Sequence, residues 1–275
     1  MAEQGQKDLS WRKALAPESP IREAAIAAAE EELKALQSTI LTLISPKDER
    51  YNEFLAKSTP GRIILDVKRN INGPGKVRCR AVKQGHLEDL TSDGSNFVYY
   101  SSVSSLVSVR CLCFEPNYTN MRIASIDVRG AFNQSLTFEQ MGKEHKYKYV
   151  VFTHPVTKEK LLFEARGPLY GEASAPRHWS DTLAEHLISE GFVRGVNETR
   201  TFYHKQRRLT LLTYVDDLLM SGEEPDLRWF EERLTHRFDC KPMIVLGTPG
   251  VKVLDHLGLE LSPMPQNISE VPTSA

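Results

Sequence analysis

Two adjacent carboxylates, Asp216 and Asp217, lie inside an otherwise apolar and β-prone run at residues 211–222. Burying an ionised carboxylate is costly unless another group compensates its charge. A divalent metal is a natural compensation, because Mg²⁺ in proteins is typically held by one or two carboxylates together with substrate phosphates. The alternative interpretation is a polar turn between two strands, since Asp is a common turn residue.

A second candidate strand, residues 123–128, also delivers a carboxylate, because its apolar run leads into Asp127. Two strands that each bring carboxylate to one sheet edge could share a pair of metal ions. Polymerases use such pairs, about 3.5–4 Å apart, to clamp an in-line phosphoryl transfer. This combination favours a metal site over a simple turn at Asp216 and Asp217.

The elements that would position these carboxylates can be predicted from the same stretch. Arg207-Arg208 interrupts two β-prone runs, 201–206 and 209–215, and a third run follows at 218–221. We expect strands at all three runs, with Asp216-Asp217 near the tight turn into the third. Such a turn exposes the carboxylates at one end of a sheet.

Five blocks of residues follow one another along the chain: 75–85, 127–133, 169–179, 214–217 (Tyr-Val-Asp-Asp) and 256–261. In this order they closely resemble the reverse transcriptase of copia-type LTR retrotransposons, a part of a retrovirus-related Pol polyprotein. The resemblance runs from about residue 11 to about residue 262. Tyr-Val-Asp-Asp alone is weakly specific, whereas five blocks in register are strong.

The resemblance implies an α+β fold, with polymerase fingers and palm, a central antiparallel palm sheet backed by helices, and an absent or truncated thumb. The expected organisation is a loosely ordered segment (1–20), a reverse transcriptase domain (21–262) with a basic fingers hairpin (about 61–85) and palm motifs (about 121–261), and a disordered tail (263–275).

Helical spacing of apolar residues predicts three helices, at about 21–44, 175–191 and 227–238. In the first, Pro20 is expected at the N1 position, Leu43 on the apolar face, and Glu30-Glu31-Glu32 on a solvated face. In the second, Ile188 is expected on the apolar face. Residues 101–113 could form a helix or a strand, and the resemblance favours a helix. A hairpin is expected at 147–153 and 160–165.

Residues 61–85 form a strongly basic stretch, with seven Lys or Arg against one acid, a local net charge of 7 − 1 = +6. A turn signal at 72–75 makes it a hairpin. Strand alternation puts Arg78 and Arg80 on one face. The resemblance implies that both bind the triphosphate, where the planar guanidinium meets phosphate oxygens in pairs. The alternative is an ordinary charged surface hairpin.

The resemblance also implies the remaining site residues, and they fall into two sets. Those implied to contact the incoming deoxynucleotide are Arg78, Arg80, Ala131, Phe132 and Ser174. Those implied to hold metal are Asp127, Val128 (through its carbonyl), Asp216 and Asp217, with Tyr214 and Val215 completing the motif.

Two of these assignments need qualification. Phe132 would exclude a ribonucleotide by occupying the space of the 2′-hydroxyl, although an aromatic at this spacing is also common in a core. The block 172–174 departs from the family, where Leu-Lys-Gln is expected and Glu-Ala-Ser stands. Glu172 is therefore expected to add negative charge where phosphates pass, which threatens activity.

Composition constrains the class of protein. Hydrophobic residues make up 40% and charged residues 26% of 275 residues, as in soluble globular proteins, and the formal net charge is −1. No apolar run approaches the roughly 20 residues of a membrane span, and no signal peptide is evident, so a cytoplasmic (virus-like particle) or nuclear location is expected. The four cysteines fit buried thiols better than disulfides or a zinc site.

The favoured function is template-directed addition of dNTPs to a primer 3′-end on RNA or DNA. Two Mg²⁺ ions, or Mn²⁺ as a substitute, would be held at Asp127, Asp216 and Asp217. The expected partners are template, primer and dNTPs, and the sequence leaves the oligomeric state open. The altered 172–174 block and near-zero net charge favour an alternative, a catalytically inactive domain that retains nucleic-acid or protein binding. A two-metal nuclease or phosphatase is a weaker alternative, because only His204 lies near the carboxylates in sequence.

Overall fold

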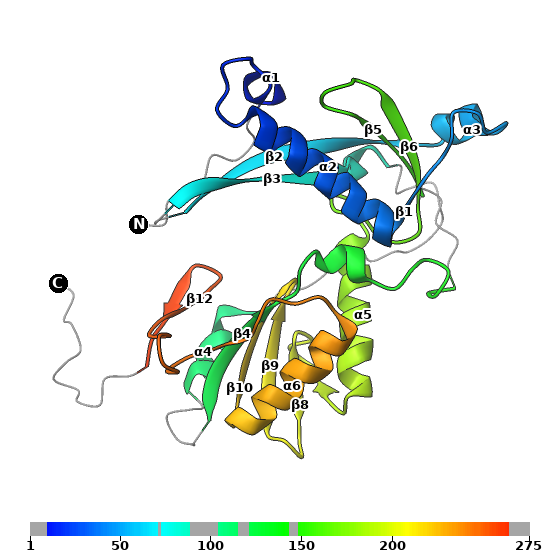
Figure 1. Cartoon of the computed structure of the whole chain (residues 1–275). Coiled ribbons are helices and arrows are strands. Elements are labelled where there is room, and N and C mark those ends of the chain that lie inside the picture. Colours follow the sequence, from blue (N-terminus) through cyan, green and yellow to red (C-terminus); the bar gives the residue numbers. More distant parts are fainter. Residues whose placement is uncertain (1–9, 71–72, 89–103, 115–120, 143–147, 264–275) are drawn as a thin grey trace. The chain divides into compact units, whose positions relative to one another are not determined.

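Helices and sheets both contribute to the structure, a computed structural model, which confirms the α+β class (Figure 1). It describes residues 10–70, 73–88, 104–114, 121–142 and 148–263, so the 263–275 tail is described only at residue 263. The chain divides into two compact units. The first unit comprises residues 1–101 and 132–182, and the second comprises 102–131 and 183–275.

The first unit is built on a five-stranded sheet with the order β1-β6-β5-β2-β3. Its strands are β1 (Leu41–Leu43), β2 (Thr59–Asn70), β3 (Gly73–Lys83), β5 (Tyr149–Thr153) and β6 (Lys160–Ala165). Its helices are α1 (Trp11–Ala14), α2 (Arg22–Thr39), α3 (Tyr51–Ala56) and the start of α5 (Ala175–Ser189). All neighbouring strands pair antiparallel except β2 and β5, which pair in parallel.

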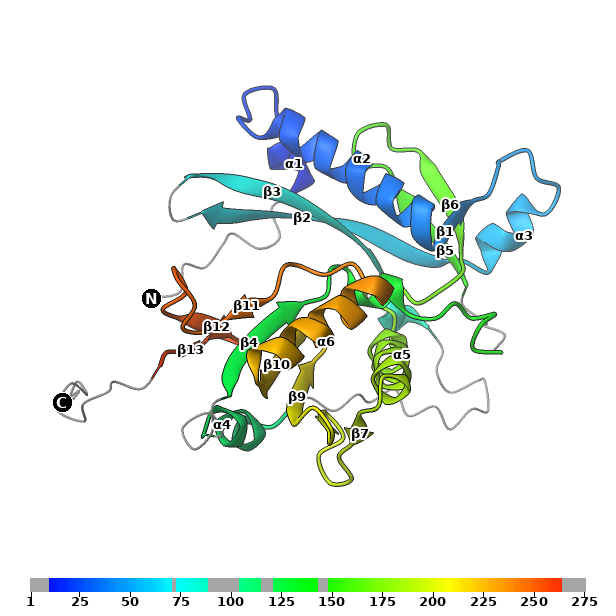
Figure 2. The same ribbon diagram turned by 60° about the horizontal axis from the view of Figure 1, so that its bottom comes forward.

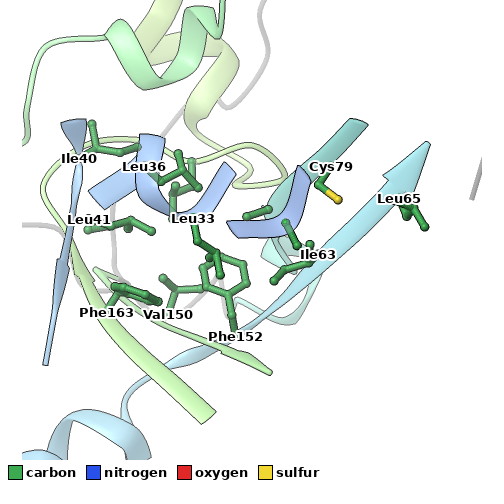
Figure 3. Packing of buried hydrophobic residues seen from close by; sticks show 14 of the residues in the cluster. Leu33, Leu36, Ile40, Leu41, Ile63, Leu65, Cys79, Val150, Phe152 and Phe163 are labelled. Carbon is green, nitrogen blue, oxygen red and sulfur yellow. The ribbon is translucent and has the colours of Figure 1, made fainter. Parts of the chain in front are cut away.

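The core of the first unit forms where α2 packs against this sheet (Figure 3). The helix buries Ala25, Ala29, Leu33 and Leu36, which are spaced so that they share one face. They pack in one cluster with strand residues such as Phe152, which is fully buried. The alanines let the helix approach the sheet closely at its N-terminal half.

Three expectations about the N-terminal helix are wrong. The helix ends at Thr39 rather than near residue 44, because the chain from Leu41 to Leu43 pairs with β6 as a strand. Leu43 is therefore not on the helix face and is 51% exposed. Pro20 precedes the N-cap residue, Ile21, and so does not occupy N1. Strand pairing here outweighs the apolar periodicity that extends past the helix.

Contacts of Glu32 and Trp11 correct two further expectations. Glu32 is half-buried and accepts a hydrogen bond from the backbone N–H of Ala81 (3.0 Å), so it is not simply a solvated residue. The bond covers an edge of β3, and covered edges resist pairing with other chains. The segment before residue 20 is not wholly loose, because α1 packs its Ala14 into the core and Trp11 donates to the Ile63 carbonyl (2.6 Å).

The basic hairpin is confirmed as β2 and β3, which pair from Gly61↔Lys83 to Asn70↔Gly73. Its expected turn at 72–75 is shifted, since β3 already begins at Gly73 and residues 71–72 lie outside the described part. The predicted hairpin of β5 and β6 is also confirmed.

The second unit is built on a six-stranded, entirely antiparallel sheet with the order β11-β4-β10-β9-β8-β7. Its strands are β4 (Arg122–Asp127), β7 (Val193–Arg194), β8 (Thr201–His204), β9 (Leu209–Tyr214), β10 (Asp217–Gly222) and β11 (Ile244–Val245). A separate hairpin comprises β12 (Leu254–His256) and β13 (Leu259–Leu261). All strands predicted around the carboxylates are confirmed.

Helices cover this sheet. Helix α6 (Glu224–Arg237) packs against β10 and β4 (Figure 1), with Leu227, Phe230 and Leu234 buried, as predicted. Helix α4 (Leu106–Phe114, Figure 2) resolves the helix-or-strand alternative in favour of the helix. Its buried Val109 and Leu112 pack in one cluster with strand residues that include Leu219.

The predicted helix at 175–191 is confirmed as α5, which ends at Ser189. Trp179, Leu183 and Leu187 are buried as expected, whereas Ile188 is 53% exposed and does not belong to the apolar face. No helix in the described part of the chain is long and apolar enough to cross a membrane.

Candidate active site

The hairpin of β9 and β10 presents the paired carboxylates. Tyr214 and Asp217 pair across it, so Val215 and Asp216 form a two-residue turn. Val215 has φ = 53°, a left-handed conformation that is rare and strained for a β-branched residue. Buried neighbours such as Leu212 and Leu218 anchor both strands, while Asp216 and Asp217 remain only half-buried.

Asp127 meets this hairpin from the neighbouring strand. In the register of β4 and β10, Asp127 lies directly opposite Asp217, so the two side chains share one face of the sheet. The N–H of Val128 donates to the Asp216 carbonyl (2.9 Å), which ties the end of β4 to the turn. Asp127 therefore meets Asp216 and Asp217, about ninety positions later in the sequence, at one end of the sheet.

Crowding of carboxylates changes the acidity of Asp217. Burial, together with the negative charges of Asp216, Asp127 and Asp255, raises the pKa of Asp217 to about 6, against the opposing charge of Lys241. Directly opposed like charges are unfavourable in a sheet. A group of this kind binds a proton, or another cation, more readily than an isolated carboxylate does.

One cation comes from the chain itself. Lys241 Nζ lies 2.9 Å from Asp127 Oδ2, and the backbone N–H of Lys241 donates to the Asp127 carbonyl (2.8 Å). The backbone is held there by a bridge between Val128 and Cys240. Lys241 therefore partly neutralises the carboxylate end of the sheet.

The donor set can be tested against the expected divalent metal. Carboxylate oxygens are the ligands that Mg²⁺ prefers, and the repulsion that raises the pKa of Asp217 is what a dication would relieve. Among the described residues, however, no group of three His, Cys, Asp or Glu side chains is arranged to hold a metal ion. The donor chemistry fits Mg²⁺ or Mn²⁺, while the three-carboxylate set is not preassembled.

The arginines predicted to bind phosphate lie in the first unit, on β3. Arg78 and Arg80 are both exposed, while Cys79 and Ala81 between and beside them are buried, as strand alternation predicts. Arg78 lies directly opposite Asp66 on β2, which lowers the local positive charge. Arg80 also has an acidic neighbour, because its positive charge acts to lower the pKa of Glu32.

Arg80 belongs to a row of three side chains in the first unit. Its guanidinium carbon lies 5.8 Å from the ring centroid of Tyr170, within cation–π range. The Tyr170 ring in turn lies 4.7 Å from that of Phe132, centroid to centroid. Phe132 and Tyr170 are both half-buried.

The expectation for Glu172 is wrong. Its side chain is buried rather than exposed to passing phosphates, and its Oε2 lies 3.4 Å from Lys83 Nζ. Lys83 is also buried and lies 2.6 Å from Glu88 Oε1. Ser174 donates its hydroxyl to Glu172 Oε1 (2.6 Å) and is itself buried. The residues that differ from the family block therefore belong to a buried polar cluster, in which the positive charge of Lys83 balances part of the negative charge of Glu172 and Glu88.

The other predicted site residues differ in exposure. Ala131 and Val128 are fully buried, while Tyr214 and Val215 are half-buried. His204 is buried, with its ring packed at right angles to that of Phe192 (5.2 Å between centroids), so it has a structural role and does not support a nuclease site.

The cysteines are all free thiols, as predicted, but not all are buried. Cys79 is buried in β3, whereas Cys111 is exposed on α4, and Cys113 and Cys240 are half-buried. Burial raises the pKa of Cys79 to about 12, so that thiol is unreactive at neutral pH.

Two residues with a clear place in the site were missed from the sequence. Lys241 is a single lysine in a loop segment, and nothing in its spacing predicts a partner more than one hundred positions away. Tyr170 lies inside a recognised block, so the block itself was a signal, but its side chain carried no assigned role.

Comparison with known proteins identifies the family. A family model described as reverse transcriptase (RNA-dependent DNA polymerase) matches residues 53–262. The chain belongs to the reverse transcriptase family. Two curated relatives from Arabidopsis thaliana are the retrovirus-related Pol polyproteins from transposons RE1 and RE2, 28% and 26% identical over 184 residues. These matches confirm the copia-type resemblance.

Each of those matches covers 66% of this chain but only 12% of the relative, so this reverse transcriptase chain spans a small share of the polyproteins. Similar solved structures include apo telomerase from Candida tropicalis truncated from the C-terminal domain, with a TM-score of 0.47 and 12% identity, covering 86% of this chain and 58% of that one. A second apo telomerase structure from that organism has a TM-score of 0.46 and 12% identity, covering 86% and 51%.

Proposed function

We propose that this reverse transcriptase domain adds deoxynucleotides to a primer 3′-end under the direction of an RNA or DNA template. In this proposal the six-stranded sheet of the second unit is the palm sheet, and β2–β3 is the fingers hairpin. The observation that carries it is the register of β4 and β10, in which Asp127 lies directly opposite Asp217 beside the strained turn.

Asp127, Asp216 and Asp217 would hold the divalent metal, with the Val128 carbonyl as a further candidate ligand. When bound, Mg²⁺ or Mn²⁺ would supply activation of the primer hydroxyl and neutralisation of charge on the leaving pyrophosphate. The carboxylates would position the metal. Because the pKa of Asp217 is raised, their ability to bind metal would depend on pH.

Binding of the nucleotide falls to residues of the first unit. Arg80 and Arg78, both exposed, would hold the triphosphate, since a guanidinium pairs with two phosphate oxygens at once. Phe132 would occupy the space of a 2′-hydroxyl and so select deoxynucleotides by shape. Ala131, which precedes Phe132 in the chain and is the last residue of the 102–131 segment of the second unit, is small and fully buried. Catalysis would then consist of positioning and electrostatics without a covalent intermediate.

Primer extension tests this function. The protein is assayed with Mg²⁺, dTTP and an oligo(dT) primer on poly(rA), and Asp216→Asn is expected to lower extension by roughly 100-fold or more, as for loss of a preorganised electrostatic group. Asp48→Asn, at an exposed turn, is the matched control and should retain activity. Extension that survives Asp216→Asn would show that the metal assignment is wrong.

A second candidate function is nucleic-acid binding without catalysis. It is favoured by one observation, the ion pair that already engages Asp127 with Lys241. Filter binding with labelled template–primer separates the candidates: retention of the duplex without nucleotide incorporation supports this second function, whereas incorporation excludes it.

A further inference from the structure

In the loop that precedes α5, Tyr170 is half-buried, whereas Glu172 and Ser174 are buried. Glu172 and Ser174 are 3% and 8% exposed. The Ser174 hydroxyl is donated to Glu172, and Glu172 also pairs with Lys83. Ser174 is therefore engaged inside the first unit, which leaves Tyr170 as the half-exposed polar side chain of this loop.

Tyr170 is held by backbone contacts with β3 and the residues that follow it. The N–H of Lys83 donates to the Tyr170 carbonyl (2.7 Å), and the N–H of Gly85 donates to the Gly171 carbonyl (3.2 Å). Gly171 has φ = 83°, and a Cβ on it would come within 2.1 Å of the Lys83 carbonyl oxygen. Only glycine lets the loop run so close to β3, so Tyr170 is fixed relative to Arg80.

The resulting row of Arg80, Tyr170 and Phe132 matches a particular kind of ligand. A guanidinium binds phosphate oxygens, while an aromatic ring offers a face to a planar heterocycle or a sugar. Three side chains from β3, the loop before α5 and the segment after β4 thus combine an anion-binding group with two ring surfaces. This combination suits a nucleoside triphosphate better than free phosphate.

We infer that Tyr170, rather than Ser174, is the residue of the 169–179 block that contacts the incoming nucleoside triphosphate, through its ring. This inference rests on the proposed function and adds a residue to it. The ring lies between the phosphate-binding Arg80 and the sugar-selecting Phe132. Loss of the ring should therefore weaken binding of a nucleotide but not of inorganic triphosphate, which needs only the arginines of β3.

Equilibrium binding of a fluorescent dATP to the full chain tests the inference, with unlabelled tripolyphosphate as the competing anion. Tyr170→Leu, which keeps an apolar side chain of similar volume, should bind the nucleotide about tenfold more weakly, the size of a lost aromatic stacking contact. Its affinity for tripolyphosphate should not change. Tyr170→Phe keeps the ring and should bind the nucleotide as the wild type does.

Tyr203→Leu, at an exposed tyrosine of β8, is the matched control and should leave both affinities unchanged. Equal nucleotide affinity of wild type and Tyr170→Leu would overturn the inference while the proposed function stands. The same holds if Ser174→Ala, and not Tyr170→Leu, weakens binding. A parallel loss of tripolyphosphate affinity would show that Tyr170 only supports Arg80, which also overturns it. A wild-type chain that binds no nucleotide would refute the proposed function itself.

Discussion

Burial and neighbouring carboxylates raise the pKa of Asp217 to about 6, so the metal-free protein holds a proton there more tightly than the unfolded chain does. A folded-state pKa above the unfolded one means that stability is lost as pH rises from about 4 to about 6. Asp217→Asn removes that loss, because the amide cannot ionise.

We therefore expect Asp217→Asn to unfold at a higher temperature than wild type when divalent metal is absent. The shift of about two pKa units, discounted for partial exposure, corresponds to on the order of 1 to 3 kcal/mol at pH 7.5 and about half of that at pH 5. Thermal unfolding at both pH values in EDTA measures it. A difference that is the same at both values would contradict the electrostatic explanation.

At the same site, the Lys241 ammonium competes with a metal ion for the carboxylate of Asp127. The ammonium must leave Asp127 before that oxygen can ligate a metal, and the pair is partly exposed, so it contributes about 1 kcal/mol or less. Lys241→Met should then bind Mn²⁺ up to about fivefold more tightly at pH 8, measured by electron paramagnetic resonance titration. Lys252→Met, at an exposed lysine, is the control. Weaker Mn²⁺ binding by Lys241→Met would indicate that the lysine supports the metal site.

At the scale of elements, the turn between β9 and β10 stores strain. A β-branched residue at φ = 53° costs about 1–3 kcal/mol, and glycine adopts this conformation freely, although it also loses about 1 kcal/mol of chain entropy on folding. Val215→Gly should therefore raise the free energy of unfolding by about 1 kcal/mol in urea denaturation. Val253→Gly, exposed and without positive φ, should not raise it.

The buried cluster that joins β3 to the loop before α5 predicts an asymmetry. Lys83→Met would leave two buried carboxylates, Glu88 and Glu172, without their lysine, and breaking such a pair costs about 3–5 kcal/mol. Glu172→Gln leaves Lys83 paired with Glu88 and keeps an acceptor for Ser174, so it should cost about 1 kcal/mol or less. Urea denaturation of both variants compares the two costs. Equal costs would show that the charges are not coupled.

At the scale of the whole molecule, the net charge of −1 means that affinity for nucleic acid depends on local charge. Each phosphate neutralised by a cation contributes about 0.9 to the slope of log K against log salt. Replacing exposed Arg62 and Lys76 on β2–β3 by Gln should reduce that slope by up to about 2 for a template–primer duplex. Replacing Lys13 and Lys34 by Gln in the N-terminal helices is the control, and an equal reduction there would argue against the hairpin as the binding surface.

Much of the secondary structure of the second unit could be predicted from the sequence. The strands that carry Asp127 and Asp217 and the buried face of α6 follow from local apolar patterns, which reflect burial directly. The same reasoning failed at residues 41–43, where the pattern is compatible with a continued helix and pairing with β6 selects a strand.

What the sequence determined by itself is the family and the identity of the acidic residues, because motif spacing survives along the chain without reference to its folding. What only the tertiary structure decided is which side chains are in contact. Lys241 lies beside Asp127, Glu172 is turned inward to Lys83, and Tyr170 contacts both Arg80 and Phe132. These are contacts between residues 38 to 114 positions apart in the chain. Which side chains meet depends on strand register and burial, and no periodicity in a linear sequence encodes a pairing over such separations.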